Sequence, residues 1–204
     1  MLVRYSALVS VLLASGVSLL HGATIYRESV SGDFSNSGLS PTQVTVGLGS
    51  NQIFGTTGNA GSGIDRDYFT ITIPANEALT GITVLAGTTS GGATSFIGLQ
   101  AGPQVTLPTN ASTAAGLLGW WHYGPSDVGS DILSKIAIPV NGAIGFTTPL
   151  GPGQYSFWVQ DFNAGAFNYG FDLAVAAAAA TPEPATWGLL VAGLCVAIRR
   201  RRTT

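Results

Sequence analysis

The chain has 204 residues and carries little charge: 9% of the residues are charged, 46% are hydrophobic and 28 are glycine. Between residues 24 and 180, three Arg or Lys residues stand against nine Asp or Glu residues, a formal net charge of −6. A surface of this sign lacks the cationic groups that gather nucleic-acid phosphates, so we expect no nucleic-acid partner. The only cysteine, Cys195, lies near the C-terminus, which excludes a disulfide or a thiol nucleophile from residues 24–180.

The N-terminal residues have the layout of a secretory signal peptide. Arg4 precedes an apolar stretch at residues 6–20, and the small residues Gly22 and Ala23 follow it. This order predicts a signal peptide over residues 1–23 that is cleaved after Ala23. His21 fits such a cleavage site poorly, so an uncleaved N-terminal anchor stays open as the alternative.

The middle of the chain predicts short strands and no long helix. Apolar and polar side chains alternate between Gly, Pro and Asn breaks, as with Phe69, Ile71 and Ile73 on one side of their segment. Nine such segments occur, at residues 42–48, 51–57, 68–74, 79–86, 94–100, 116–123, 143–148, 154–160 and 168–175. They predict an all-β fold, an antiparallel β-sandwich or jelly roll over residues 24–175. Turn residues at 163–165 separate the last two segments, which we expect to pair as a hairpin.

Four consecutive residues, Trp120, Trp121, His122 and Tyr123, give the most suggestive candidate for a binding surface. In a strand, Trp120 and His122 share one face while Trp121 and Tyr123 share the other, so one aromatic pair points away from the core. Outward aromatic rings offer platforms on which sugars stack, which makes Trp120, Trp121 and Tyr123 candidate glycan-binding residues. The alternative is that the outer pair only covers a hydrophobic rim.

The residues typical of catalysis are scarce. After residues 1–23, His122 is the only histidine, and no Gly-x-Ser-x-Gly motif supplies a serine nucleophile. We therefore predict no enzyme and no cofactor; a secreted hydrolase that uses His122 or an acidic pair is the alternative. Carboxylates could bind calcium, and the candidates are Asp65, Asp67, Asp127 and Asp131, with Asp161 and Asn163 as a further pair. Asp residues of this kind also cap turns by accepting backbone hydrogens.

The C-terminal residues combine three features in a fixed order. A linker at residues 176–181 leads to Pro182, Glu183 and Pro184, an apolar segment follows at residues 185–198, and the segment ends at Arg199, Arg200, Arg201 and Arg202. A helix over residues 185–198 would be about 21 Å long, against about 30 Å for the hydrocarbon core of a bilayer. It would span a membrane only weakly, and the arginines would hold the C-terminus in the cytoplasm. A buried core helix is the alternative reading.

Residues 182–204 resemble a PEP-CTERM sorting signal, with Pro182-Glu183-Pro184, a Gly-containing apolar helix and an arginine cluster. The resemblance implies that an exosortase-type membrane peptidase recognises this segment in an exopolysaccharide-producing bacterium. It also implies an exported protein that is transiently anchored in the inner membrane and then reaches the cell envelope or the extracellular space.

A second resemblance lies in the strand-forming part of the chain. The stretches SNQIFGTTG at residues 50–58, DRDYFTITIPANEALTGITV at 65–84 and GPGQYSFWVQDFNAGAFNYGFDLAV at 151–175 are similar to strands of the bacterial pre-peptidase C-terminal domain. That family is an antiparallel β-sandwich on secreted enzymes, and some members bind collagen or polysaccharide. Residues 88–150 would be an atypical insertion. The C-terminal sorting segment, the acidic core with its small polar residues and the aromatic residues at 120–123 together predict a noncatalytic protein of the envelope or extracellular matrix that acts by binding or by structural display, with exopolysaccharide as the partner to test first.

Overall fold

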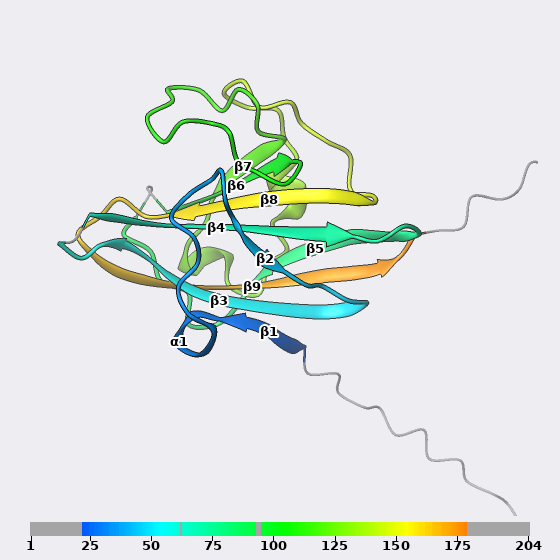
Figure 1. Cartoon of the computed structure of the whole chain (residues 1–204), viewed down its shortest axis with the longest axis horizontal. Coiled ribbons are helices and arrows are strands. Elements are labelled where there is room, and N and C mark those ends of the chain that lie inside the picture. Colours follow the sequence, from blue (N-terminus) through cyan, green and yellow to red (C-terminus); the bar gives the residue numbers. More distant parts are fainter. Residues whose placement is uncertain (1–21, 62, 93–94, 179–204) are drawn as a thin grey trace, which may run out of the picture.

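The structure is a computed structural model that describes residues 22–61, 63–92 and 95–178. This part of the chain contains nine strands, two one-turn helices and a 3-10 turn (Figure 1). The strands are β1 (Ala23–Arg27), β2 (Thr42–Val44), β3 (Gly49–Asn59), β4 (Ile64–Ile73), β5 (Glu77–Val84), β6 (Phe96–Ala101), β7 (Gly119–His122), β8 (Gly153–Gln160) and β9 (Gly165–Ala177). The helical elements are α1 (Glu28–Ser31), η1 (Pro125–Asp127) and α2 (Leu133–Ile136).

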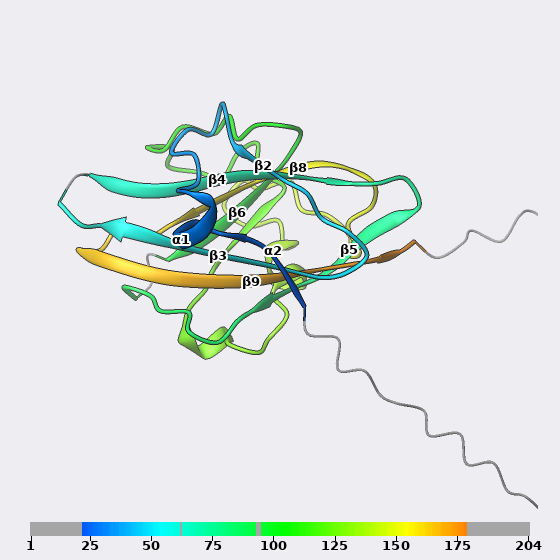
Figure 2. The same ribbon diagram turned by 60° about the horizontal axis from the view of Figure 1, so that its bottom comes forward.

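The strands form one curled sheet in the order β5-β9-β3-β4-β8-β6-β7. Neighbours along this path are antiparallel, whereas β1 joins β3 and β2 joins β4 in parallel pairs. Only two residue pairs connect β3 and β4, both at one end of the strands, and the sheet bends there from one layer into the other. As a result, β9 and β3 lie in one layer and β4 and β8 lie in the other (Figure 2). The predicted all-β class is confirmed, with a mainly antiparallel sheet.

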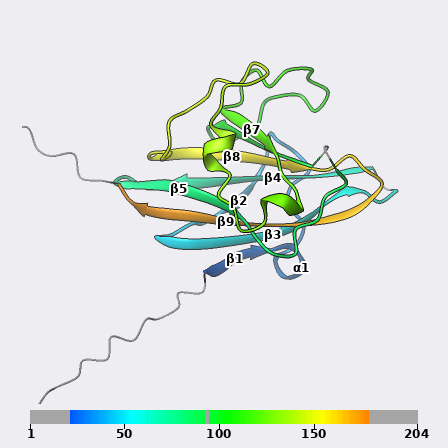
Figure 3. The same cartoon turned by 180° about the vertical axis from the view of Figure 1, so that it is seen from behind.

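The core lies between the two layers and follows the alternation of the sequence. Side chains from both layers are fully buried in one cluster, including Phe69 of β4, Phe157 of β8 and Phe171 of β9. Phe69 and Phe157 are direct partners in the β4–β8 ladder, and their rings stack with centroids 4.8 Å apart. Burying each such ring stabilises the fold by about 1.5–3 kcal/mol. At one end, the connection between β7 and β8 carries α2 against β5 and β7 (Figure 3).

The opposite face of β4 and β8 is also covered. Tyr68 and Trp158 stack there, with ring centroids 5.6 Å apart, and belong to a second buried cluster with Val105, Ala114, Leu117 and Ala143. These last residues come from the long loops after β6 and before β8, which lie above β8 in Figure 1. The loop after β6 is held down because Ser156 Oγ donates a hydrogen bond of 2.8 Å to the Gly102 carbonyl. Strands β6, β7 and β8 therefore have the main core on one face and these loops on the other. A cavity can form between the loops and the strands.

Two predictions about the strands are wrong. Residues 154–160 and 168–175 do form β8 and β9, but β8 pairs with β4 and β6, while β9 pairs with β3 and β5. The connection between β8 and β9 crosses from one layer to the other. Asp161, at its start, accepts a hydrogen bond from the backbone N–H of Gly91, which holds the connection against the loop after β5. Residues 143–148 form no strand, since the N–H groups of Ile144 and Gly145 donate to carbonyls of the loop at 117–118. The structure instead contains β1, which was not predicted.

Both predicted targeting segments fall largely outside the described residues. Of the predicted signal peptide only residues 22 and 23 are described, and the predicted sorting segment at 182–204 lies wholly outside. Ala23 is the first residue of β1, and β9 continues to Ala177. Across the described ranges, every helix is too short and too polar to cross a membrane.

Candidate functional site

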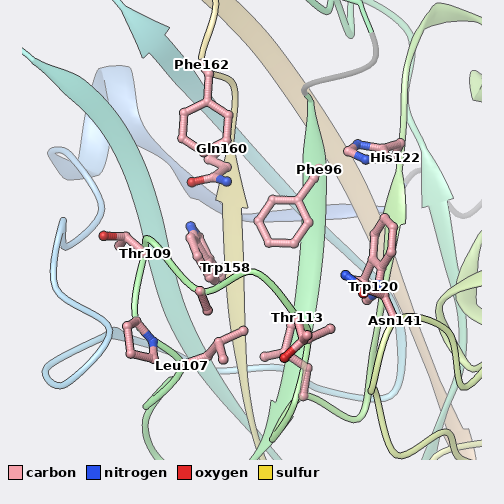
Figure 4. Close-up of a pocket in the computed structure, with 14 residues that line it drawn as sticks. Phe96, Leu107, Thr109, Thr113, Trp120, His122, Asn141, Trp158, Gln160 and Phe162 are labelled. Atoms are coloured by element: carbon pink, nitrogen blue, oxygen red, sulfur yellow. The ribbon is translucent and has the colours of Figure 1, made fainter.

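A cavity of about 380 Å³ lies on the outer face of β6, β7 and β8. Its floor is made by side chains of the three strands, and the loop at residues 107–114 forms one wall (Figure 4). The volume lies within the range of about 300–1,000 Å³ that small-ligand pockets occupy. The lining residues are Phe96, Leu107, Pro108, Thr109, Ala111, Thr113, Ala114, Leu117, Trp120, His122, Asn141, Trp158, Gln160 and Phe162.

Strand alternation brings the aromatic residues of the cavity to one face. Phe96 of β6 is paired with His122 of β7 on one side and with Gln160 of β8 on the other. The Phe96 ring meets Trp158 edge-on at 4.9 Å between centroids, and Trp120 meets His122 edge-on at 5.1 Å. Figure 4 shows Trp158 and Trp120 on opposite sides of Phe96. The cavity thus lies between two indole rings.

Gly98 keeps the floor of the cavity open. It is paired with Trp120 on one side and with Trp158 on the other, so the two tryptophans flank a position without a side chain. A Cβ atom here would come within 3.1 Å of Leu117 Cδ1 and 3.2 Å of the Phe96 ring. Such contacts are tighter than ordinary packing allows, so any other residue would push these side chains into the space.

Polar groups with hydrogen-bonding capacity line the same space. Trp158 Nε1 is buried and has no hydrogen-bond partner in the described part of the chain. Gln160 Oε1 accepts a hydrogen bond of 3.2 Å from Arg66 Nε, which fixes the orientation of the amide. Because the Trp158 N–H is shielded from solvent, the polar side chains that line the cavity are those of Gln160, His122, Asn141, Thr109 and Thr113.

The predicted glycan-binding residues divide between the two faces of β7. Trp120 lines the cavity, and its Nε1 donates to the Val140 carbonyl at 3.3 Å. Tyr123 is only 3% exposed and packs edge-on against Phe171 in the core. Trp121 packs against the same core, with Lys135 Nζ 5.1 Å from its ring centroid. Of the three, only Trp120 lies at the cavity.

Sequence reasoning missed the other aromatic residues of the cavity, namely Phe96, Trp158 and Phe162. The signal was present in part, because Trp158, Gln160 and Phe162 follow one another at a spacing of two residues and all line the cavity. Phe162 is 41% exposed and forms the open edge. Nothing in the sequence showed that the loops at 102–118 and 137–146 would turn this face into a pocket.

The structure places His122 close to a serine and a carboxylate, but not in the order that nucleophilic catalysis needs. Ser95 is fully buried and its Oγ donates to Asp161 Oδ2, while His122 Nδ1 lies 3.0 Å from the Ser95 carbonyl oxygen. A catalytic base has to reach the nucleophile's hydroxyl. Here the hydroxyl is directed at the carboxylate instead.

Two of the predicted calcium ligands hold local structure. Asp127 Oδ1 accepts from Lys135 Nζ at 2.7 Å, and its Oδ2 accepts the Gly124 N–H. Asp131 Oδ1 accepts the N–H groups of Ile82 and Leu133, at 2.8 and 2.9 Å. Both side chains therefore act as the turn caps that the sequence left open as the alternative.

Asp67 belongs to a different acidic group. Its carboxylate lies with those of Glu28 and Asp33, and the three can offer oxygens that all fall within 4.8 Å of one another. Asp65 is outside this group and accepts a hydrogen bond of 3.3 Å from Asn36 Nδ2. Burial, and then the Glu28 carboxyl, raises the pKa of Asp67 to about 10, and burial also raises the pKa of Glu28 to about 7. The sequence could not indicate this group, because Asp67 is more than thirty residues from its two partners.

No known protein family, curated protein or solved structure matches the chain. The resemblances of residues 182–204 and of the strand segments therefore depend on those stretches alone. What the protein does has to be argued from the cavity and from the acidic group.

Proposed function

We propose that the protein is a noncatalytic, exported binding or structural protein, and that its cavity binds a sugar unit of a polysaccharide. The single observation that carries the proposal is the cavity with Trp120 and Trp158 on opposite sides of Phe96 and the neutral polar side chains of Gln160, Asn141 and His122 in its lining (Figure 4). Sugar rings have apolar C–H faces that stack on aromatic rings, and hydroxyls that pair with amides, imidazoles and indole N–H groups.

The lining also favours a class of sugar. None of the 14 lining residues is Asp, Glu, Lys or Arg, and the adjoining cation, Arg66, lies behind Gln160 and 5.9 Å from the centroid of the Phe162 ring. Gln160, Asn141 and His122 provide neutral or weakly basic hydrogen-bonding groups. An uronic acid would find no charged group among the lining side chains and would lose hydration, while the Arg66 guanidinium is already bonded to Gln160, so we expect neutral polysaccharides to bind best.

Binding is tested by comparing two tryptophan variants of the full-length chain. Trp120→Ala should weaken binding to a neutral polysaccharide about 10-fold, which corresponds to about 1.4 kcal/mol, because one wall of the cavity is lost. Trp121→Ala removes the same side chain from the opposite face of β7 and should keep the wild-type affinity. Affinity electrophoresis against neutral and uronic-acid polysaccharides measures both. Equal affinities of wild type and Trp120→Ala would contradict the proposal.

The location of the protein is a further part of the proposal. The PEP-CTERM-like order of Pro182, Glu183 and Pro184, an apolar segment and four arginines supports export and recognition by an exosortase-type membrane peptidase. Intact-mass measurement of the protein from its native cells, with and without that peptidase, tests this. Loss of the C-terminal segment only when the peptidase is present is the expected result, and an intact C-terminus in both strains would contradict it.

The finer fold class is proposed on similar grounds. The two facing layers with a shared core support a β-sandwich of the jelly-roll or pre-peptidase C-terminal type, because β3, β4, β5, β8 and β9 coincide with the segments that carry that resemblance. The two parallel pairs, β1 with β3 and β2 with β4, depart from a purely antiparallel sandwich.

A hydrolase is the second candidate, because Ser95, His122 and Asp161 lie together beside the cavity. The direction of the Ser95 hydrogen bond argues against it. Hydrolysis of a bound polysaccharide that disappears in His122→Ala would favour the enzyme, whereas binding without release of reducing ends supports the noncatalytic proposal.

A further inference from the structure

The Asp67 carboxylate occupies a position that normally holds an apolar side chain. Along β4, residues 67, 69, 71 and 73 share the core-facing side, and the last three are Phe, Ile and Ile. Asp67 is fully buried, and neither of its oxygens has a hydrogen-bond partner among the described residues. A buried carboxylate without partners is very unfavourable, so a proton or a cation has to compensate its charge.

No side-chain cation among the described residues does so. The ion pair between Lys135 and Asp127 is the only one found in the described ranges, and it lies elsewhere. The nearest ionisable groups are instead the carboxylates of Glu28 and Asp33. Glu28 Oε1 and Oε2 each accept one backbone N–H, from Phe34 at 3.3 Å and Thr56 at 2.7 Å, and each oxygen keeps a lone pair.

A neutral oxygen atom, that of the Tyr169 hydroxyl, lies beside this group of carboxylates. Tyr169 is 2% exposed, and its hydroxyl is buried with no hydrogen-bond partner in the described structure. The hydroxyl lies over Gly55, where a Cβ atom would collide with it, and so beside the Thr56 N–H that holds Glu28. The hydroxyl also lies close enough to the Asp67 carboxyl for each group to shift the pKa of the other, so this buried polar atom faces the acidic group, where a ligand could use it.

We propose that Glu28, Asp33, Asp67 and the Tyr169 hydroxyl form a calcium site. Calcium binds oxygen at 2.3–2.6 Å, so two oxygens on one ion can be up to about 4.6–5.2 Å apart, and oxygens that all lie within 4.8 Å of one another can reach the same ion. Magnesium binds at 2.0–2.1 Å and would require a tighter group of oxygens.

The ion has access from two sides. A cavity of about 340 Å³ is lined by Glu28 and Tyr169, and another of about 250 Å³ is lined by Asp33. The ion would join the N-terminal segment, which carries Glu28 and Asp33, to β4 in the opposite layer. Calcium would thus tie the β1–α1 segment across the edge of the sandwich.

The test is calorimetric titration of the full-length protein, stripped with EDTA, with calcium chloride. We expect one calcium ion per chain, and a melting temperature that rises by about 3–6 °C at ten times the dissociation constant. Asp67→Asn should abolish both effects. If that variant fails to fold, Asp33→Asn, whose side chain is exposed, should still weaken calcium binding at least 10-fold.

The matched control is Asp131→Asn. It likewise replaces one Asp carboxylate, but one outside the acidic group that accepts the N–H groups of Ile82 and Leu133, so the calcium response should stay as in the wild type. The proposal is overturned if the wild type shows neither heat nor a melting shift up to 10 mM calcium, about ten times the weakest affinity expected of an extracellular site. An equal response to magnesium, or an unchanged response in both Asp33→Asn and Asp67→Asn, would also overturn it. None of these outcomes bears on polysaccharide binding.

Discussion

At the scale of single residues, Asp161 connects three parts of the chain through one carboxylate. It accepts hydrogen bonds from the N–H groups of Gly91 and Asn163 and from the Ser95 hydroxyl. Burial alone would raise the pKa of this carboxyl, but these hydrogen bonds outweigh it, and the pKa is lowered from the ordinary 3.8. Asp161 therefore stabilises the folded state in its charged form.

A pH dependence follows from the lowered pKa of Asp161. The stabilisation is fully present above the unfolded pKa near 4 and is lost as the pH falls through the lower folded pKa. Asp161→Asn should melt at a lower temperature than the wild type at pH 5–7, and the gap should narrow from pH 5 to pH 2. Circular dichroism melting over this range measures it. A gap that stays constant with pH would contradict the assignment.

The acidic residues show how far single residues can be interpreted from sequence. Two roles were open for them, calcium ligand and turn cap, and the structure confirms turn capping for Asp127 and Asp131, while calcium binding stays a prediction. The group of Glu28, Asp33 and Asp67 could not be predicted from the sequence, because it depends on a parallel pairing of β1 with β3 that brings Glu28 beside β4. Short-range spacing carries no information about such a contact.

At the scale of elements, β7 has two faces with different tasks. Trp120 and His122 line the cavity on the outer face, whereas Tyr123, at the inner end, is buried against Phe171. The alternation of the sequence correctly predicted that these pairs separate. Which pair faces outward depends on the neighbour β6, and that could not be predicted.

The two faces of β7 should respond differently to truncation. Tyr123→Ala should lower the free energy of unfolding by about 3–5 kcal/mol, since it leaves a cavity in the core. Trp120→Ala should cost clearly less, because its ring is only partly buried. Urea denaturation of both variants measures the difference. Equal losses, or a larger loss for Trp120→Ala, would show that the faces are assigned wrongly.

The connection between β8 and β9 shows why the pairing of strands was harder to predict than the strands. The alternation in residues 154–160 and 168–175 identified both strands and their core-facing residues. Turn residues indicate that the chain reverses, but a reversal within one layer and a crossing between layers use similar residues. The decisive contacts, from Asp161 to Gly91 and Ser95, join segments about seventy residues apart.

At the scale of the whole molecule, the strand order separates central strands from edge strands. β8 is bonded on both sides, to β4 and β6, and β9 is bonded on both sides, to β3 and β5. β1, β2 and β7 each pair with a single strand in the described structure. Both β8 and β9 also contribute buried side chains to the shared core, among them Phe157 and Phe171.

This arrangement predicts the order of amide hydrogen exchange. Amides of β8 and β9 should exchange slowest, through global unfolding, whereas amides of β1, β2 and β7 should exchange earlier through local opening. Hydrogen exchange followed by mass spectrometry of peptides measures the order. Protection of β1 or β2 equal to that of β9 would contradict the assigned strand order.

The position of β9 also bears on how the domain withstands tension. β9 is paired with β3 from Ala166 to Val175 and with β5 from Phe171 to Ala177, through ladder bonds perpendicular to the strand. A pull on the chain beyond residue 178 is directed along the strand axis, so it loads these bonds together in shear instead of opening them one by one. A domain tethered through this strand would resist flow or drag without needing a covalent crosslink.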